Sequence, residues 1–541
     1  MRIAGAILEY LKTAEVDYLF GIPAGTISPL FDALNDVDIK PIVAKNEGGA
    51  AYMAARYASV TGKMAVCLGA GGVGANNMVN GIGDAFRAKA PMLVITGYVH
   101  RWQIGKGAIQ ELNTEDILKP ITKYSKTILS EEEVMAELAH AVKLANTVPK
   151  GPVHLSVPID IQLNQLTGVI PVYEKEHLKK DIYETFPEEA IEVIESSQKG
   201  LIMVGKGARG YSKEIMELSS QLQWPVVTTP EGKGVISSDF KFNLGNYGFA
   251  SSDAASEYVN NPETDCLLVL GTSLGENATS NFSKALVNGK KIIHVDWDKR
   301  ELGKVYETDV KICMDLKYAL DYLLKNTTPS EDTGFVKPEI NHSVIKSNTG
   351  LSLREFMIKI PDYMPNNTFY MADMGEFMNF VFKYLEIPSG GDFETNLNYA
   401  AMGCAIGGAV GVQVADLNRT VAVFAGDGDF FMNGMEIFTA KEYNLPIVYF
   451  IVNNAMLGFV EHGHQFLFER VVKGFKQERI SISNILAAAG IKTMEINDVS
   501  QMDKLTEFLK DLNGPAVIEL ITDGSEPAPN GDRLKSLQKQ N

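Results

Sequence analysis

The sequence predicts an α/β fold made of three doubly wound domains, each built on a parallel sheet. Short apolar runs of strand length alternate with amphipathic helical patterns along the chain, as in parallel sheets covered by helices on both faces. Polar stretches over 166–188 and 326–350 interrupt this alternation and are typical of linkers. We therefore expect domains over residues 1–165, 185–327 and 350–525, and a polar tail over 526–541.

The composition indicates a soluble globular protein, since its 541 residues are 45% apolar, and its four cysteines fit a reducing cytoplasm. A formal charge of −17 argues against nucleic acid or an anionic membrane as the main partner, because both would repel it. The four cysteines have no CxxC spacing, so they predict neither a zinc site nor disulfides. The chain begins in a helical pattern, and no signal peptide or membrane span is expected.

The first domain contains strand-like runs such as YLFGIP, MAVCLGA and PMLVITG. Glu47 stands where one strand passes into a helix rich in small residues, a place where an isolated glutamate is usually a solvated helix-start charge. The run Gly69–Gly74 formally satisfies GxGxxG, but no acidic residue ends the following strand, so a dinucleotide site is weakly supported. Gln110, in the run GKGAIQE, would be an ordinary surface residue by itself.

The second domain repeats the alternation with the runs LIMVG, PVVTT, CLLVLG and KIIHVDW. It contains another formal GxGxxG over Gly205–Gly210.

The third domain carries the most informative stretch, from Gly426 to Asn454. An apolar strand, Val421–Ala425, runs into Gly-Asp-Gly, and a second apolar strand delivers Asn453-Asn454. Parallel strands end at one edge of a sheet, so the Asp427 carboxylate and the Asn454 amide oxygen can converge there. Such oxygen ligands suit Mg²⁺ or Ca²⁺ when phosphate supplies the rest of the shell. Glycines let the backbone approach an anion, and the next helix offers its first NH groups.

This GDG…NN pattern resembles the signature of thiamine diphosphate (ThDP) enzymes, and the resemblance covers nearly the full chain. It implies a pyrimidine-binding, a middle and a diphosphate-binding domain in that order. It also implies that Asp427, Asn454 and the Met456 carbonyl hold Mg²⁺. The cofactor-binding residues that it implies are Glu47, Gly72, Asn77, Met402, Gly426, Gly428, Asp429 and Asn454.

Several of these residues have a specific role in ThDP enzymes. The resemblance implies that Glu47 bonds a ring nitrogen of the cofactor's pyrimidine and so activates the cofactor. It places Met402, a core residue by default, beneath the bent cofactor. The run Gly72–Asn77 resembles the GPGATN-type loop of the acetolactate synthase and pyruvate oxidase branch, with Val73 in place of proline.

Positions around the substrate resemble acetolactate synthases more than pyruvate decarboxylases. Gly25 stands where decarboxylases place an aspartate, and Gln110 matches a glutamine of the synthases. Val460 stands where enzymes that protonate the reaction intermediate carry a glutamate, so it indicates a carboligase. Gly463 replaces a tryptophan and leaves room for a larger substrate. We expect Glu47, Gln110, Val460 and His462 to be the catalytic residues.

The resemblance is weakest in the middle domain, which binds FAD in the acetolactate synthase branch. The His-Gly element and the Arg-rich run of that branch appear here as Gly245–Gly248 and Gly271–Glu276. We therefore expect a middle domain without a cofactor rather than FAD, although the acidic spacing of the segment His294–Asp298 leaves FAD open.

The resemblance implies an acetolactate synthase-like enzyme. It decarboxylates a 2-oxo acid, pyruvate or a larger one, and ligates the acyl unit to a carbonyl acceptor. The alternatives are a 2-hydroxyacyl-CoA lyase or acyltransferase, and an inactive regulatory or scaffold homologue. In this family each site is shared between two copies of the chain, so a homodimer or homotetramer is expected.

Overall fold

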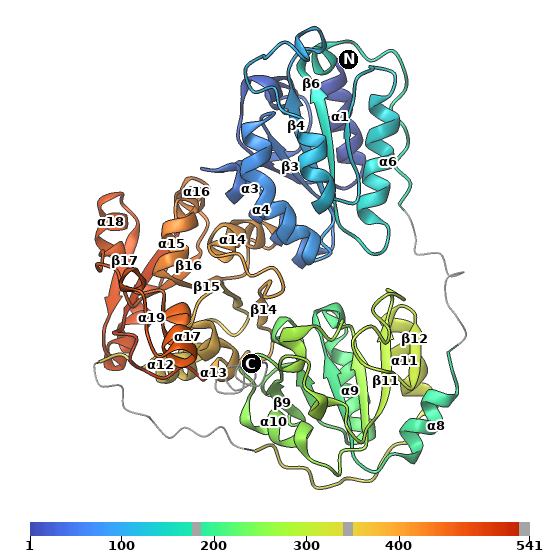
Figure 1. The fold of residues 1–541 in the computed structure, drawn as a ribbon, viewed down its shortest axis with the longest axis vertical. Helices are drawn as coiled ribbons and strands as arrows, with labels where there is room; N and C mark the ends of the chain where they lie inside the picture. The colour runs from blue at the N-terminus through green and yellow to red at the C-terminus, as the bar shows by residue number, and fades with distance from the viewer. Residues whose placement is uncertain (176–185, 339–349, 530–541) are drawn as a thin grey trace.

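The computed structural model describes residues 1–175, 186–338 and 350–529, and it confirms three α/β domains (Figure 1). Each domain has a six-stranded sheet in which neighbouring strands run parallel. Parts of both expected linkers and most of the expected tail lie outside the described residues.

The first sheet has the strand order β2-β1-β3-β4-β6-β5. Its strands are β1 (Tyr18–Gly21), β2 (Lys40–Val43), β3 (Ala65–Gly69), β4 (Met92–Tyr98), β5 (Ser125–Thr127) and β6 (Pro152–Pro158). Its helices are α1 (Ile3–Thr13), α2 (Ser28–Ala33), α3 (Glu47–Thr61), α4 (Val73–Arg87), α5 (Thr114–Leu118), α6 (Val134–Asn146) and α7 (Ile159–Leu163). The central strands β3 and β4 are buried along their whole length, as strands covered on both faces must be.

The middle sheet has the order β12-β11-β10-β7-β8-β9. Its strands are β7 (Gly200–Val204), β8 (Val226–Thr228), β9 (Asn243–Asn246), β10 (Cys266–Leu270), β11 (Lys291–Asp296) and β12 (Val310–Cys313). Its helices are α8 (Glu189–Ser196), α9 (Ser212–Leu222), α10 (Asp253–Asn260) and α11 (Leu316–Asn326).

The third sheet has the order β14-β13-β15-β16-β18-β17. Its strands are β13 (Phe369–Ala372), β14 (Asp392–Glu394), β15 (Val421–Gly426), β16 (Val448–Asn453), β17 (Lys492–Ile496) and β18 (Ala516–Ile521). Its helices are α12 (Leu353–Lys359), α13 (Met378–Tyr384), α14 (Cys404–Ala415), α15 (Asp427–Asn433), α16 (Glu436–Glu442), α17 (Gly458–Phe468), α18 (Ile482–Ala488) and α19 (Leu505–Phe508). Adjacent β15 and β16 carry the two halves of the predicted metal motif.

Helices α3 and α14 join the first domain to the third (Figure 1). Both are rich in glycine and alanine, and one hydrophobic core runs through them. A Cβ atom at Gly411 would come within 2.0 Å of the Met53 carbonyl oxygen. The close approach of the two helix backbones therefore requires glycine at position 411.

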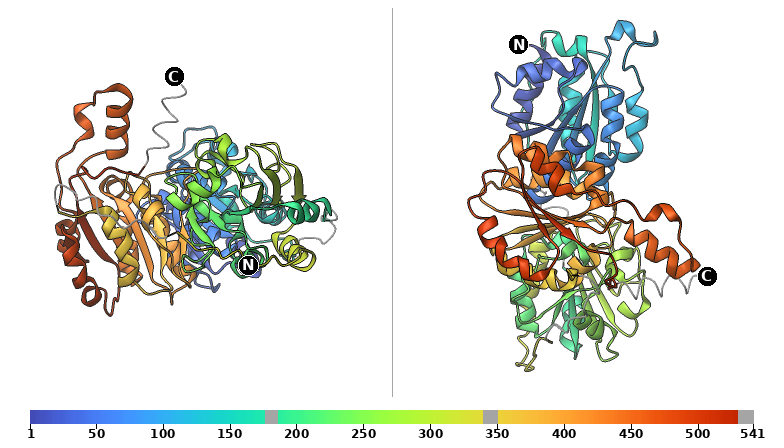
Figure 2. Two further views of the ribbon diagram at one scale, coloured as in Figure 1. Left: turned by 90° about the horizontal axis from the view of Figure 1, so that it is seen from below. Right: turned by 90° about the vertical axis from the view of Figure 1, so that its left-hand side faces the viewer.

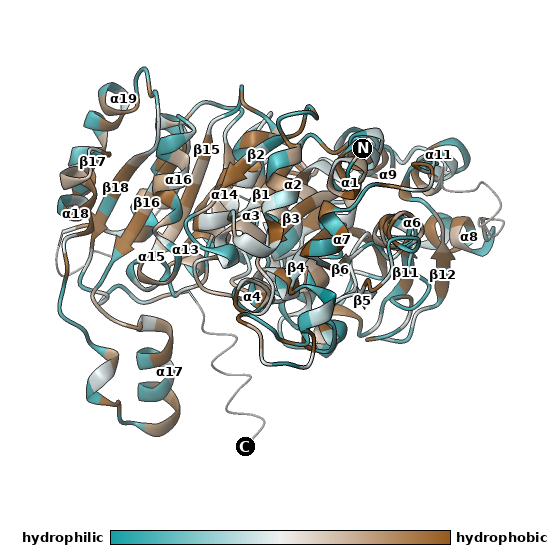
Figure 3. Cartoon of the chain, turned by 90° about the horizontal axis from the view of Figure 1, so that it is seen from above, coloured by the Kyte–Doolittle hydropathy of each residue, from teal (hydrophilic) through white to brown (hydrophobic). Residues whose placement is uncertain are grey.

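Helix α17 projects from the third domain as an arm (Figures 2 and 3). The arm and the segment that follows it expose several large apolar side chains, although most apolar side chains of the sheets are buried. They are Val460, Phe468, Val471 and Val472. In the part of the chain that the structure describes, no helix has the length and apolar character needed to cross a membrane.

Candidate active site

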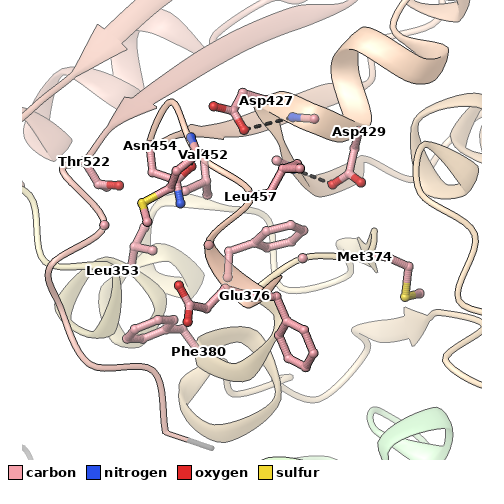
Figure 4. Close-up of a pocket in the computed structure, with 18 of the residues that line it drawn as sticks. Leu353, Met374, Glu376, Phe380, Asp427, Asp429, Val452, Asn454, Leu457 and Thr522 are labelled. Atoms are coloured by element: carbon pink, nitrogen blue, oxygen red, sulfur yellow. Dashed lines mark hydrogen bonds between the residues drawn. The ribbon is translucent and has the colours of Figure 1, made fainter. Parts of the chain in front are cut away.

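A cavity opens at the carboxyl ends of β13, β15 and β16, the edge where ligands of parallel sheets bind (Figure 4). Its walls come from the turns after these strands, from the start of α17 and from the segment after β18. Eight of the predicted residues line it: Met402, Gly426, Asp427, Gly428, Asp429, Asn454, Met456 and Val460. The spacing of the GDG and NN motifs thus places both at one edge of the sheet.

Asp427 is the first residue of α15 and is only partly exposed. Its Oδ1 accepts a hydrogen bond from the Gly428 NH at 2.8 Å, and its Oδ2 accepts one from the Ala455 NH at 2.8 Å. Burial raises the pKa of this carboxyl despite the two backbone donors. A bound cation would stabilise the charged carboxylate here.

The segment after β16 places Asn454 beside Asp427 (Figure 4), and Met456 of the same segment lines the cavity. Ala455 adopts the left-handed conformation, with φ of 54°, and so turns the chain sharply between them. The Met456 NH donates to the Asn454 Oδ1 at 3.1 Å. This segment pairs with residues 475–477 through hydrogen bonds of the Ala455 carbonyl and the Leu457 NH. The Met456 carbonyl takes no part in this pairing.

Met402 lies directly against the Gly-Asp-Gly turn, just before α14. A Cβ atom at Gly428 would come within 2.9 Å of the Met402 Cε, so the methionine side chain packs closely on this glycine. Asp373, at the end of β13, holds the segment by accepting bonds from the NH groups of Gly403 and Ala405, both at 2.8 Å. Burial raises the pKa of Asp373 to about 6.

Asp429 is fully buried, and its Oδ2 accepts a hydrogen bond from the Gly426 NH at 2.6 Å (Figure 4). Burial and the nearby Asp373 raise its pKa well above the ordinary value. The hydrogen bond between the Gly426 NH and Asp429 therefore stabilises the turn that carries Asp427.

His462 lies on α17 two residues after Val460, and its Nδ1 is 2.6 Å from the Oε1 of Glu376. The hydrogen bond to Glu376 raises the pKa of His462. Glu376 lines the cavity on the wall opposite Asp427 and Asn454, close to Phe380 (Figure 4). The sequence analysis missed this glutamate. Its position just after a strand, at the same sheet edge as Asp427, was the available signal.

The remaining predicted residues lie together on the first domain, outside this cavity of the same chain. The Asn77 Nδ2 donates to the Glu47 Oε2 at 2.9 Å, where α3 and α4 begin. The Gln110 carbonyl oxygen would lie within 2.7 Å of a Cβ atom at Gly72, so the loop of Gln110 closes over the start of α4. The predicted residues of one chain therefore form two groups, called half-sites below: Glu47, Gly72, Asn77 and Gln110 on the first domain, and the predicted metal motif on the third.

The donors at the metal motif fit a magnesium ion that also binds phosphate. A carboxylate, a side-chain amide and a backbone carbonyl are all oxygen ligands of the kind that Mg²⁺ prefers. Asp427 is bonded by backbone NH groups only, so its charge is not neutralised by an ion pair among the described residues. Met402 and the glycines beside it form a surface on which a flat ring and a diphosphate can lie.

A second cavity lies at the carboxyl ends of the middle-domain strands and includes Lys206 and Arg209. Both side chains form ion pairs with Glu394 of the third domain. Lys206 Nζ is 2.5 Å and Arg209 Nη1 is 2.8 Å from its carboxylate oxygens. The NH groups of Gly205 and Gly207 bond the carbonyls of Leu270 and Gly271. The NH groups of Gly205 and Gly207 and both cations of this glycine loop therefore already have partners within the chain.

Family models match three successive parts of the chain. They are the thiamine pyrophosphate enzyme N-terminal TPP binding domain over residues 1–117, the central domain over 187–323 and the C-terminal TPP binding domain over 373–520. The chain is 30% identical to the acetolactate synthase large subunit of Lactococcus lactis over 96% of its length and 92% of that protein. It is 28% identical to acetolactate synthase isozyme 1 large subunit of Escherichia coli, over 97% of this chain and 95% of that protein. The probable acetolactate synthase large subunit of Methanococcus aeolicus is also 28% identical, over 99% of this chain and 95% of that protein.

Proposed function

Because the chain belongs to the thiamine pyrophosphate enzymes and is acetolactate synthase-like, we propose that it decarboxylates a 2-oxo acid and ligates the acyl unit to a carbonyl acceptor. The donor is pyruvate or a larger 2-oxo acid, and the cofactors are ThDP and Mg²⁺. The observation that carries the proposal is the convergence of Asp427, Asn454 and Met456 in a cavity whose wall includes Val460.

In this proposal the oxygens of Asp427, Asn454 and Met456 hold Mg²⁺, and Met402 supports the cofactor from below. Glu47, oriented by Asn77, bonds the pyrimidine end. ThDP, when bound, supplies the carbon nucleophile and the electron sink for loss of carbon dioxide. The protein binds and orients both reactants and excludes water.

Val460 gives the cavity an apolar wall, which supports ligation over simple decarboxylation. A valine side chain has no acidic proton to donate to the reaction intermediate. The acyl unit is therefore kept for the acceptor rather than released as an aldehyde. Gly463 lies on the same helix with nothing within 4 Å of the position of a Cβ atom, so this part of α17 leaves space for a larger substrate.

We further propose that two copies of the chain complete each site. The half-sites on the first and third domains lie apart within one chain, which supports a second copy as the source of Glu47 and Gln110. Both half-sites carry exposed apolar side chains of the kind that a subunit interface covers: Val73, Trp102, Ile109, Phe431, Met432 and Met435. The smallest assembly with complete sites is a homodimer, and a homotetramer fits equally.

For the middle domain we infer a structural role without FAD. The ion pairs of Lys206 and Arg209 with Glu394 support this inference, because they occupy the two cations beside the glycine loop. Flavin absorbance of the purified protein tests this inference directly.

The proposed activity is tested with a panel of 2-oxo acids and aldehydes, with products identified by mass spectrometry. We expect a ligated product that requires both ThDP and Mg²⁺. Carbon dioxide release without any ligated product across the panel would contradict the proposal, and ligation that requires coenzyme A would favour the lyase or acyltransferase alternative.

Val460→Glu is predicted to shift the products from ligation toward free aldehyde, because it places a proton donor in the apolar wall. The ratio of aldehyde to ligated product should rise about tenfold or more. Val460→Ile, which keeps the wall apolar, is the control. An unchanged ratio in Val460→Glu would show that this wall does not decide the outcome.

A further inference from the structure

Decarboxylative ligation consumes one proton in each turnover. The bond between the donor's carboxyl and carbonyl carbons breaks, and carbon dioxide leaves. A new carbon–carbon bond forms to the acceptor's carbonyl carbon, and the acceptor's oxygen takes up a proton. That proton must come from solvent into a cavity from which bulk water is excluded.

The cavity wall contains few groups that can deliver it. None of its described lining residues is a histidine, lysine or arginine. Of its other carboxylates, Asp427 is assigned to the metal, and Asp429 is bonded to the Gly426 NH. Glu526 is bonded to the start of α12, and the exposed Asp523 accepts bonds from the NH and hydroxyl of Ser525.

Glu376 differs from these carboxylates because it is bonded to a group that reaches solvent. Its side chain is 8% exposed and faces the cavity, whereas the side chain of His462 is 37% exposed. The Nδ1–Oε1 distance of 2.6 Å allows direct proton transfer between them. The other charged groups near His462 are Glu461 and Lys476, which pair with each other at 3.4 Å.

Resting on the function proposed above, we propose that His462 and Glu376 form a proton relay that carries a proton from solvent to the acceptor's carbonyl oxygen. His462 takes up the proton at its exposed side and passes it from Nδ1 to Glu376, and Glu376 delivers it within the cavity. Val460 lines the same cavity but has no acidic proton, so within this cavity the proton is supplied by the pair and not by Val460.

The relay is tested with Glu376→Gln and His462→Gln in the full-length protein loaded with ThDP and Mg²⁺. Gln retains the size of glutamate but cannot pass on a proton. The matched control is His464→Gln, on the same helix, since His464 packs edge-on against Phe468 and Phe475 rather than against Glu376. Thermal melting checks that each variant folds, and because His462 is partly exposed, its substitution tests the relay even if Glu376→Gln does not fold.

The readouts are the first-turnover burst of carbon dioxide and the steady-state rate of ligated product, both from carboxyl-labelled pyruvate or another productive 2-oxo acid of the panel. Loss of the first carbon dioxide needs no proton, so we expect the burst and the ThDP affinity to be unchanged in both variants. Steady-state ligation should fall about 10- to 100-fold, and the double variant should be no slower than the slower single variant.

Ligation rates within twofold of the wild type in both variants would overturn the relay. A smaller burst would also overturn it, since the pair would then act on donor or cofactor binding. More free aldehyde from the wild type than from the variants would mean that the pair protonates the donor fragment instead. Failure of the proposed function is a separate result, because the wild type itself would then form no ligated product from any 2-oxo acid.

Discussion

Asp427 is the carboxylate that the proposed function assigns to Mg²⁺. Its carboxyl is partly buried, its bonds come from backbone NH groups, and burial raises its pKa. Asp427→Asn is therefore predicted to weaken Mg²⁺-dependent ThDP binding at least about 100-fold, without lowering the melting temperature of the cofactor-free protein.

Calorimetric titration with ThDP and Mg²⁺ measures this loss. Asp523→Asn, which changes another carboxylate of the same cavity, is the control and should bind normally. If Asp427→Asn bound the cofactor as tightly as the wild type, the assignment of the metal site would be wrong.

His154 sets the pH dependence of stability in the first domain. It is fully buried on β6 between the hydroxyls of Thr96 and Ser125, at 2.9 and 2.8 Å, and burial lowers its pKa from 6.5 to about 3. As the pH falls, the unfolded chain takes up this proton before the folded chain does. The contribution of His154 to stability is therefore present above pH 6.5 and is lost progressively between pH 6.5 and 3.

Between pH 7 and pH 5, His154 is predicted to reduce the free energy of unfolding by up to about 2 kcal/mol. In His154→Gln the free energy of unfolding should fall less steeply with decreasing pH. Denaturant unfolding at each pH measures this slope. His140→Gln, which changes an exposed histidine of the same domain, should keep the slope of the wild type. Equal slopes in all three proteins would contradict the prediction.

At the scale of elements, helix α3 is held by a carboxylate of another domain. Glu436 of α16 is fully buried and accepts bonds from the NH groups of Lys45 and Asn46, at 3.2 and 3.0 Å. These residues precede Glu47, so Glu436 fixes the start of the helix that carries it. A Cβ atom at Gly49 would come within 2.1 Å of the Glu436 Oε1, so only glycine fits there.

Glu436→Ala is predicted to destabilise the protein by about 2–3 kcal/mol, because it leaves buried NH groups without an acceptor. It should also lower kcat, since Glu47 loses its fixed position. The control is Glu442→Ala on the same helix, which removes an exposed ion pair with Lys45 and should cost less than about 0.5 kcal/mol. Chemical denaturation and steady-state kinetics measure both effects, and a variant of Glu436 as stable as the wild type would show that this contact is dispensable.

The sequence allowed prediction of the elements and of residues that follow strands, because strand periodicity and parallel pairing put strand ends at one edge. Asp427 and Asn454 were found in this way. The contacts of Glu376 with His462 and of Glu436 with Lys45 could not be predicted, since 86 and 391 residues separate the partners along the chain. Such pairs depend on how α17 and α16 are placed in space, which no local pattern encodes.

At the scale of the whole molecule, Glu394 ties the three domains together. Its carboxylate lies 3.3 Å from Arg56 of the first domain and 2.5 Å from Lys206 of the middle domain. Arg56 also pairs with Asp84 at 2.6 Å, and all these groups except Lys206 are almost fully buried. A buried charge network of this kind fixes the relative positions of the domains, because removing one partner leaves the others uncompensated.

Glu47 and Gln110 do not line the cavity at Asp427 in the same chain, and the proposal that two copies share each site follows from this. The most direct measurement mixes two inactive variants, Glu47→Gln and Asp427→Asn, by co-expression with different tags. A heterodimer with shared sites has one site with both defects and one with none, so a statistical mixture should regain about a quarter of the wild-type ligation rate. A mixture as inactive as either variant alone, with the heterodimer shown to form, would contradict the account.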